Sequence, residues 1–159
     1  MKALIVYYSM SGNVKQTAEA IAAETGADLL ALYPVKAYPD KGAKKYLWGG
    51  KCALMGDKPR LKPYIFSADR YDTVIFGSPV WASSFTPPLR TFIEENRAAL
   101  AGKRLAAFVC YMGSGDQKAL KKLKRRSMSS DSPPRWCSTS RSPSRRRRMQ
   151  RRSPRSVGS

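Results

Sequence analysis

The chain has 159 residues, a length that suits one domain with a buried core. It carries 30 Lys and Arg residues against 11 Asp and Glu residues, for a formal net charge of +19. It has no histidine, and Cys52, Cys110 and Cys137 show no Cys-x-x-Cys spacing, which argues against a zinc site and against catalytic pairs that use histidine. We expect no catalytic and no metal-ligating side chain.

The positive charge is concentrated toward one end of the chain. Residues 121–159 hold 14 of the 30 Lys and Arg residues and one acidic residue, Asp131. A segment dominated by Arg, Ser and Pro cannot bury enough apolar surface to offset the entropy cost of ordering. We therefore expect a folded domain over residues 1–124 and a basic, low-complexity, disordered tail over residues 125–159.

Short apolar runs alternate with helical patterns along the first part of the chain. The runs predict strands at Lys2–Tyr8, Asp28–Leu32, Asp72–Gly77 and Arg104–Tyr111. The first and third are apolar without alternation, which suits strands buried on both faces. Apolar residues at helical spacing predict helices over 13–25, Pro87–Leu100 and Asp116–Lys124. Strands that alternate with helices indicate a parallel sheet with right-handed crossovers.

The loop between the first strand and the first helix has the composition of a phosphate site. A helix start offers free N–H groups and a positive dipole end, serines add hydroxyl donors, and glycine lets the backbone approach closely. An ordinary turn with capping serines is the alternative for this loop alone. The loop is neither Gly-x4-Gly-Lys nor Gly-x-Gly-x-x-Gly, which disfavours ATP and NAD in this pocket. Its candidate phosphate contacts are Ser9, Met10, Ser11, Gly12, Asn13 and Val14.

Two further loops follow predicted strand ends. The one after the third strand carries an aromatic residue that suits stacking on a flat ring, with backbone groups available for the polar edge of that ring. Its candidate residues are Ser78, Pro79, Val80, Trp81 and Ala82. The loop after the fourth strand is rich in glycine, and its candidate residues are Met112, Gly113 and Gly115. Packing of Trp81 in the core, and a plain turn at the glycines, are the alternatives.

With these loops in view, residues 1–124 resemble the flavodoxin family. The first loop is similar to the family's phosphate loop Ser/Thr-x-Ser/Thr-Gly-x-Thr, although Val14 stands where the family has its last Thr. The second is similar to the family's Gly-Ser/Thr-Pro-x-Trp/Tyr segment, which wraps a flavin ring. The segments 46–51 and 59–63 look like the insert of a small-flavodoxin subgroup described as NAD(P)H-dependent flavoproteins.

This resemblance implies a flavodoxin-like doubly wound parallel sheet that binds FMN at the ends of strands one, three and four. We expect strand order 2-1-3-4, with the family's fifth strand and last helix missing. The resemblance implies a redox protein that carries electrons between partner proteins, or that takes hydride from NAD(P)H for a quinone-like acceptor. The mild positive charge of residues 1–120 favours the reductase. With no long apolar segment or signal peptide apparent, we expect a cytoplasmic location.

The tail admits two other interpretations. Arg145–Arg148 and the neighbouring arginines could bind nucleic acid through phosphate charge alone, without sequence specificity. The abrupt change in composition also suggests a frameshifted translation, which would leave a functionally impaired flavodoxin. Back-translation one base earlier can give Val-Leu-Asp-Leu across residues 136–140 and Asp-Ala-Glu-Lys-Ile-Ala-Glu-Ile from Met149 onward, a strand followed by an amphipathic helix.

Overall fold

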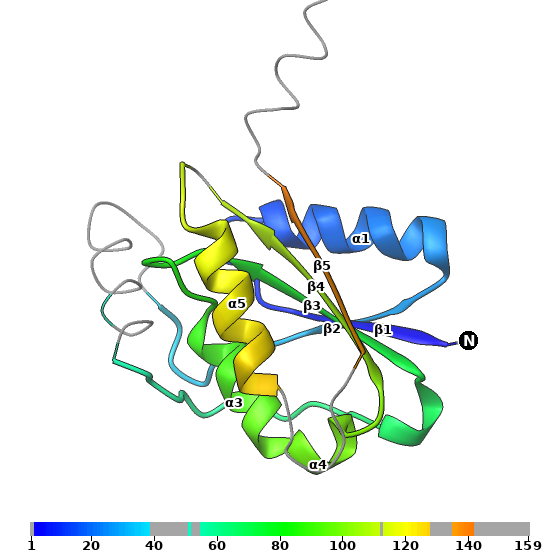
Figure 1. Ribbon diagram of the computed structural model, residues 1–159. Helices are drawn as coiled ribbons and strands as arrows, with labels where there is room; N and C mark the ends of the chain where they lie inside the picture. Colours follow the sequence, from blue (N-terminus) through cyan, green and yellow to red (C-terminus); the bar gives the residue numbers. More distant parts are fainter. Residues whose placement is uncertain (1, 39–50, 52–54, 112, 128–134, 142–159) are drawn as a thin grey trace, which may run out of the picture.

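The computed structural model describes residues 2–38, 51, 55–111, 113–127 and 135–141. In this part of the chain, five strands form one parallel sheet in the order β2-β1-β3-β4-β5 (Figure 1). The strands are β1 Ala3–Tyr7, β2 Asp28–Ala31, β3 Thr73–Pro79, β4 Arg104–Cys110 and β5 Arg135–Arg141. The predicted order of the first four strands is confirmed.

The fifth strand corrects our expectation that the sheet would end at β4. β5 pairs with β4 along its whole length, from Arg135 beside Arg104 to Arg141 beside Cys110. An edge strand is held by backbone hydrogen bonds on one side, so a polar sequence can form one without the apolar run used as the strand signal. The expected absence of a last helix, and the run Arg145–Arg148, fall on residues 142–159, outside the described residues.

Helices cover both faces of the sheet. α1 Asn13–Thr25 lies on one face, and α3 Pro87–Glu95 and α5 Asp116–Ser127 lie on the other (Figure 1). The helix predicted over Pro87–Leu100 is divided in two, because Asn96 leaves helical geometry before the short α4 Arg97–Leu100. No helix in the described ranges is long and apolar enough to cross a membrane.

Successive side chains of the central strands fill two separate cores. Ile5 and Tyr7 of β1 pack with Val14 and Ala18 of α1, whereas Leu4 and Val6 pack with residues of α3 and α5 on the opposite face. A parallel strand covered on both faces is apolar at every position, which explains the continuous runs seen in the sequence. The β1 and β3 ends are thereby held rigidly at the edge where the three candidate loops begin.

Candidate functional site

The three candidate loops leave the sheet side by side at the carboxyl ends of β1, β3 and β4. The Tyr8 N–H donates to the Gly77 carbonyl over 3.2 Å, and the Val80 N–H donates to the Cys110 carbonyl over 3.0 Å. These bonds continue the sheet by one step into the loops. Ligands of open α/β sheets bind at this edge, where the strand order reverses on either side of β1.

The first loop contains a buried polar atom that forms no hydrogen bond with the described residues. Ser9 Oγ is buried and has no hydrogen-bond partner among the described residues. Gly12 caps α1 with φ of 87°, a left-handed conformation that glycine adopts without steric cost. The first N–H groups of α1 have no acceptor within the helix. These donors belong to one loop at the positive end of α1, where an anionic group is favoured.

Val14, the departure from the family's phosphate loop, belongs to the core. Its side chain is buried against Ile5 and Ala18, on the face of the sheet that α1 covers. The side chain is therefore directed away from the loop, and position 14 can offer its backbone N–H. Asn13 and Ser11 are exposed beside it.

The second loop contains a tight two-residue turn. The backbones of Trp81 and Ser84 exchange two hydrogen bonds, each 2.9 Å long. Between them, Ala82 and Ser83 adopt φ of 47° and 55°, a left-handed conformation that costs roughly 1–2 kcal/mol for a residue with a Cβ atom. A strained turn of this kind persists only where its surroundings hold it, and such turns gather at ligand sites.

Ser78 holds this loop in place from within. Its hydroxyl is fully buried, accepts the Thr86 N–H over 3.1 Å, donates to the Pro79 carbonyl over 2.8 Å, and lies 3.2 Å from the Thr86 hydroxyl. These partners occupy the Ser78 side chain inside the protein. The sequence predicts Ser78 as a cofactor contact, and in the structure its hydroxyl is bonded within the loop.

Trp81 belongs to an aromatic cluster at the loop edge. Its ring centroid lies 5.8 Å from that of Tyr8 and 5.3 Å from that of Tyr38, with Tyr8 and Tyr38 6.1 Å apart. Burial raises the pKa of Tyr8 to about 12, so its phenol stays neutral at physiological pH. Sequence reasoning missed Tyr8 and Tyr38. The place of Tyr8 directly before Ser9 was an available signal, whereas Tyr38 has none in its neighbourhood.

The third loop packs against the second. A Cβ atom on Gly115 would lie 2.7 Å from Ser83 Oγ and 3.1 Å from Ser83 Cα, so glycine is required by this close approach. Gly113 has open space around it. Met112, the third predicted residue of this loop, lies outside the described residues. The third loop thus supports the turn that follows Trp81.

A flavodoxin family model matches residues 2–133 of the chain. This chain belongs to the flavodoxin family. Among solved structures, this chain is similar to a flavoprotein from Lactobacillus acidophilus in complex with FMN, with 22% sequence identity and a TM-score of 0.73. The similarity covers 94% of this chain and 99% of that flavoprotein. It is also similar to a putative flavoprotein from Bacteroides eggerthii, at 24% identity and a TM-score of 0.70, over 89% and 87% of the two chains.

A third similar structure is an NADH:FMN oxidoreductase in its apo form, at 19% identity and a TM-score of 0.55. The similarity covers 90% of this chain and 76% of the oxidoreductase chain. At these identities, the three likenesses show a shared fold.

Proposed function

We propose that this protein binds FMN across the three loops and acts as a redox protein. The observation that carries the proposal is the buried Ser9 hydroxyl, which finds no partner among the described residues and lies at the positive end of α1. A buried hydroxyl without a partner costs free energy, and a phosphate oxygen would satisfy it. The family membership of the chain supports this assignment.

The residues present fit the two ends of FMN. The Ser9 and Ser11 hydroxyls and the N–H groups at the start of α1 would hold the phosphate. Trp81 would contact the flavin ring, and the polar edge of the ring would face the backbone of Ala82 and Ser83, which takes no part in the two hydrogen bonds of the turn. Pro79, Val80 and Ala82 belong to the same segment and would shape this contact, and Gly113 and Gly115 would border it from the third loop. Met10, Asn13 and Val14 complete the first loop.

FMN, when bound, supplies the capacity to take up and release electrons. The protein's own residues orient and shield it. The half-buried Trp81 and the buried Tyr8 exclude water from this edge of the sheet. The neutral Tyr8 phenol adds no charge there. No side chain is needed as an acid, base or nucleophile, in keeping with a protein that lacks histidine.

For the partners of the reaction, we propose NAD(P)H as donor and a quinone-type small molecule as acceptor. The similar NADH:FMN oxidoreductase fold and the mildly basic first 120 residues support this choice. Electron transfer between partner proteins is the alternative. Steady-state NAD(P)H oxidation with a quinone distinguishes them, because a carrier without reductase activity would show no turnover.

Calorimetric titration of the FMN-free full chain with FMN and with FAD tests the cofactor assignment. A site built for a terminal monophosphate should bind FMN more tightly than FAD. Equal or tighter FAD binding would contradict the preference. If neither FMN nor FAD binds, the proposed function is overturned.

A further inference from the structure

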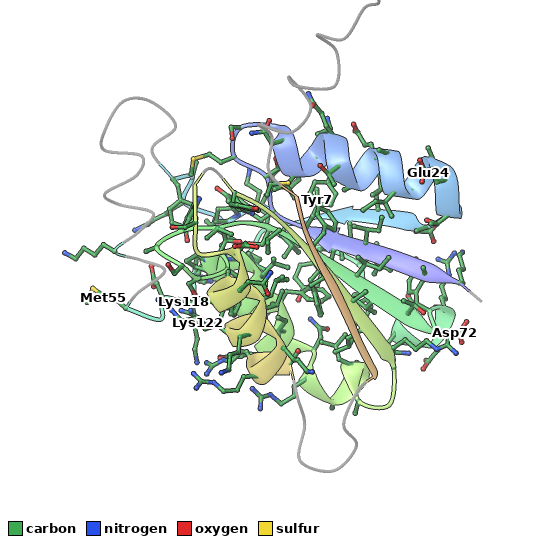
Figure 2. The ribbon with its side chains drawn as sticks, turned by 45° about the horizontal axis from the view of Figure 1, so that its top comes forward. Tyr7, Glu24, Met55, Asp72, Lys118 and Lys122 are labelled. Atoms are coloured by element: carbon green, nitrogen blue, oxygen red, sulfur yellow. The ribbon has the colours of Figure 1, made fainter. Side chains whose placement is uncertain are left out.

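A cationic groove lies beside the candidate flavin loops, between the α3–α4 segment and α5. It encloses about 450 Å³ and is lined by Gly56, Ser84, Phe85, Arg90, Arg97, Lys122, Arg125 and Arg126. Five of these lining residues are cationic and none is acidic. Figure 2 shows Lys118 and Lys122 of α5 on the same side of the molecule as Met55. This concentration of positive charge belongs to the folded domain.

Arg90 forms a fixed wall of the groove. Its side chain is buried, with the guanidinium carbon 5.3 Å from the centre of the Phe85 ring. A Cβ atom on Gly56 would lie 3.4 Å from Arg90 Nη1, so the guanidinium also packs against that backbone. A guanidinium held between a ring and a backbone segment is oriented in advance for an anion, so little entropy is lost on binding.

One acidic side chain, Glu94, forms ion pairs at the edge of the groove. Its partners are Lys58, over 2.5 Å, and Arg126. Both carboxylate oxygens are therefore engaged by cations. Arg97 Nη2 donates over 3.3 Å to the Arg126 carbonyl, which draws a further cation to the same end of α5.

The surroundings of Arg90 disfavour its positive charge. Burial and then the neighbouring Arg126 lower the pKa of Arg90, with opposing contributions from Asp57 and Tyr38. A bound anion between these guanidinium groups would relieve the repulsion. Because Arg matches phosphate geometry with paired hydrogen bonds, a phosphate ester is the anion that suits the groove best.

The groove also shares residues with the candidate flavin site. Ser84 lines the groove and pairs with the Trp81 backbone, and Phe85 follows Ser84 and supports Arg90. We propose that the groove binds the phosphate groups of a phosphorylated dinucleotide donor, NADPH in preference to NADH. The proposal rests on the proposed function, since a donor held here would lie next to the loop that contacts the flavin.

The test uses 2′,5′-ADP, which carries the phosphate that distinguishes NADPH, in calorimetric titrations of the FMN-loaded full chain. We expect 2′,5′-ADP to bind more tightly than 5′-AMP, and more weakly as salt rises. Arg97→Ala and Lys122→Ala should each weaken 2′,5′-ADP binding by about tenfold, the scale of one charge-assisted contact. Both residues are at least partly exposed, so the variants should fold.

Lys121→Ala is the matched control, because it removes the same charge from α5 at a position outside the groove lining. It should leave 2′,5′-ADP affinity within about twofold of wild type, as expected for a screened surface charge. Equal losses in the control and groove variants would overturn the proposal, as would equal affinity for 5′-AMP or for inorganic pyrophosphate.

The same titrations separate the two proposals. FMN affinity should be unchanged in Arg97→Ala and Lys122→Ala, because neither residue belongs to the three FMN loops. If wild type fails to bind FMN, the proposed function fails. The titration of FMN-free protein with 2′,5′-ADP then still decides whether the groove binds this phosphate ester.

Discussion

The Trp81 ring meets the Tyr8 ring edge-on, with the centroids 5.8 Å apart and the ring planes at 88°. Tyr8 directly follows β1 and Trp81 follows β3, so the contact joins two neighbouring strand ends. Tyr38 approaches Trp81 at a similar angle of 89°. Edge-to-face contacts leave part of each ring face open to another partner.

Replacement of Trp81 by alanine should weaken FMN binding by roughly 1–3 kcal/mol, the scale for loss of a stacked aromatic side chain. Titration of flavin fluorescence measures the effect, and quenching by the protein should decrease with it. Tyr33→Ala is a suitable control, since Tyr33 is an aromatic residue that is 60% exposed. Unchanged affinity and quenching in Trp81→Ala would refute the assignment of the ring contact.

Ser9→Ala and Ser11→Ala should weaken the binding of FMN and leave riboflavin binding unchanged. The two ligands share the ring and differ in the phosphate, so the comparison isolates the proposed phosphate contacts. We expect a loss of about 1–3 kcal/mol for FMN, the range for hydrogen bonds to a charged group. Parallel losses for FMN and riboflavin would mean that these serines act on the fold or on the ring.

Gly77→Ala should destabilise the folded protein by roughly 1–3 kcal/mol, the cost of overpacking a close-packed core. Its Cβ atom would lie 2.5 Å from Phe108 Cζ and 2.9 Å from Tyr7 Cβ. Urea denaturation measures the change. Gly102→Ala is the control, because its added Cβ atom would meet no neighbouring atom. With φ of 73° at this position, only backbone strain should destabilise that variant. If Gly77→Ala lowers the free energy of unfolding by no more than Gly102→Ala does, the core around position 77 rearranges to accommodate the added Cβ atom.

The stabilising contribution of Asp28 should disappear in acid. The Tyr71 hydroxyl donates to Asp28 over 2.8 Å and Lys2 pairs with it over 3.2 Å, which lowers the pKa of the carboxyl below its ordinary 3.8. A carboxyl whose pKa is lower in the folded state stabilises the folded protein at pH values above its unfolded pKa. This stabilisation is lost as the pH falls through the folded pKa.

Asp28→Asn should therefore reduce the free energy of unfolding at pH 7, and the difference from wild type should shrink below pH ~4. Urea denaturation over this pH range measures it. Asp69→Asn, in the short 3-10 turn Ala68–Arg70, is the matched carboxylate control. A difference between wild type and Asp28→Asn that is constant with pH would rule out the ionised carboxylate as its source.

The coding DNA should show whether the residues after 124 come from a shifted reading frame. We expect the frame one base earlier to be open and to encode an apolar strand followed by an amphipathic helix. Correction of the frame should give a more stable protein that purifies yellow with FMN. Stop codons in that frame, or the lack of a strand and helix pattern, would eliminate the hypothesis.

The sequence predicts the sheet well and its surroundings less well. Continuous apolar runs identify β1, β3 and β4, because a strand covered on both faces needs apolar residues throughout. The short run of β2 also marks a strand, although β2 lies at the edge of the sheet and is only partly buried. β5 escapes the same criterion, since Arg-Trp-Cys-Ser-Thr-Ser-Arg has no such run. The turn at Asn96 is also missed, because the apolar spacing of Leu89, Phe92 and Ile93 carries no signal of where the helix ends.

The predicted site is less complete than the predicted fold. Local motifs identify the three loops, but the role of a side chain depends on distant contacts. The Ser78 hydroxyl faces Thr86, and Gly115 meets Ser83 of another loop. The groove that includes Arg90, Arg97 and Lys122 joins three helices, and no stretch of sequence shows that these cations converge.

The strand order has a consequence for how the chain can fold while it is being synthesised. β2 joins one edge of β1, β3 joins the other, and β4 and β5 are added outward in turn. No later strand has to insert between two that are already paired. Domains fold as the ribosome releases the chain, at roughly 5–20 residues per second. Each strand of this sheet can therefore dock as it emerges, onto an edge that is already in place.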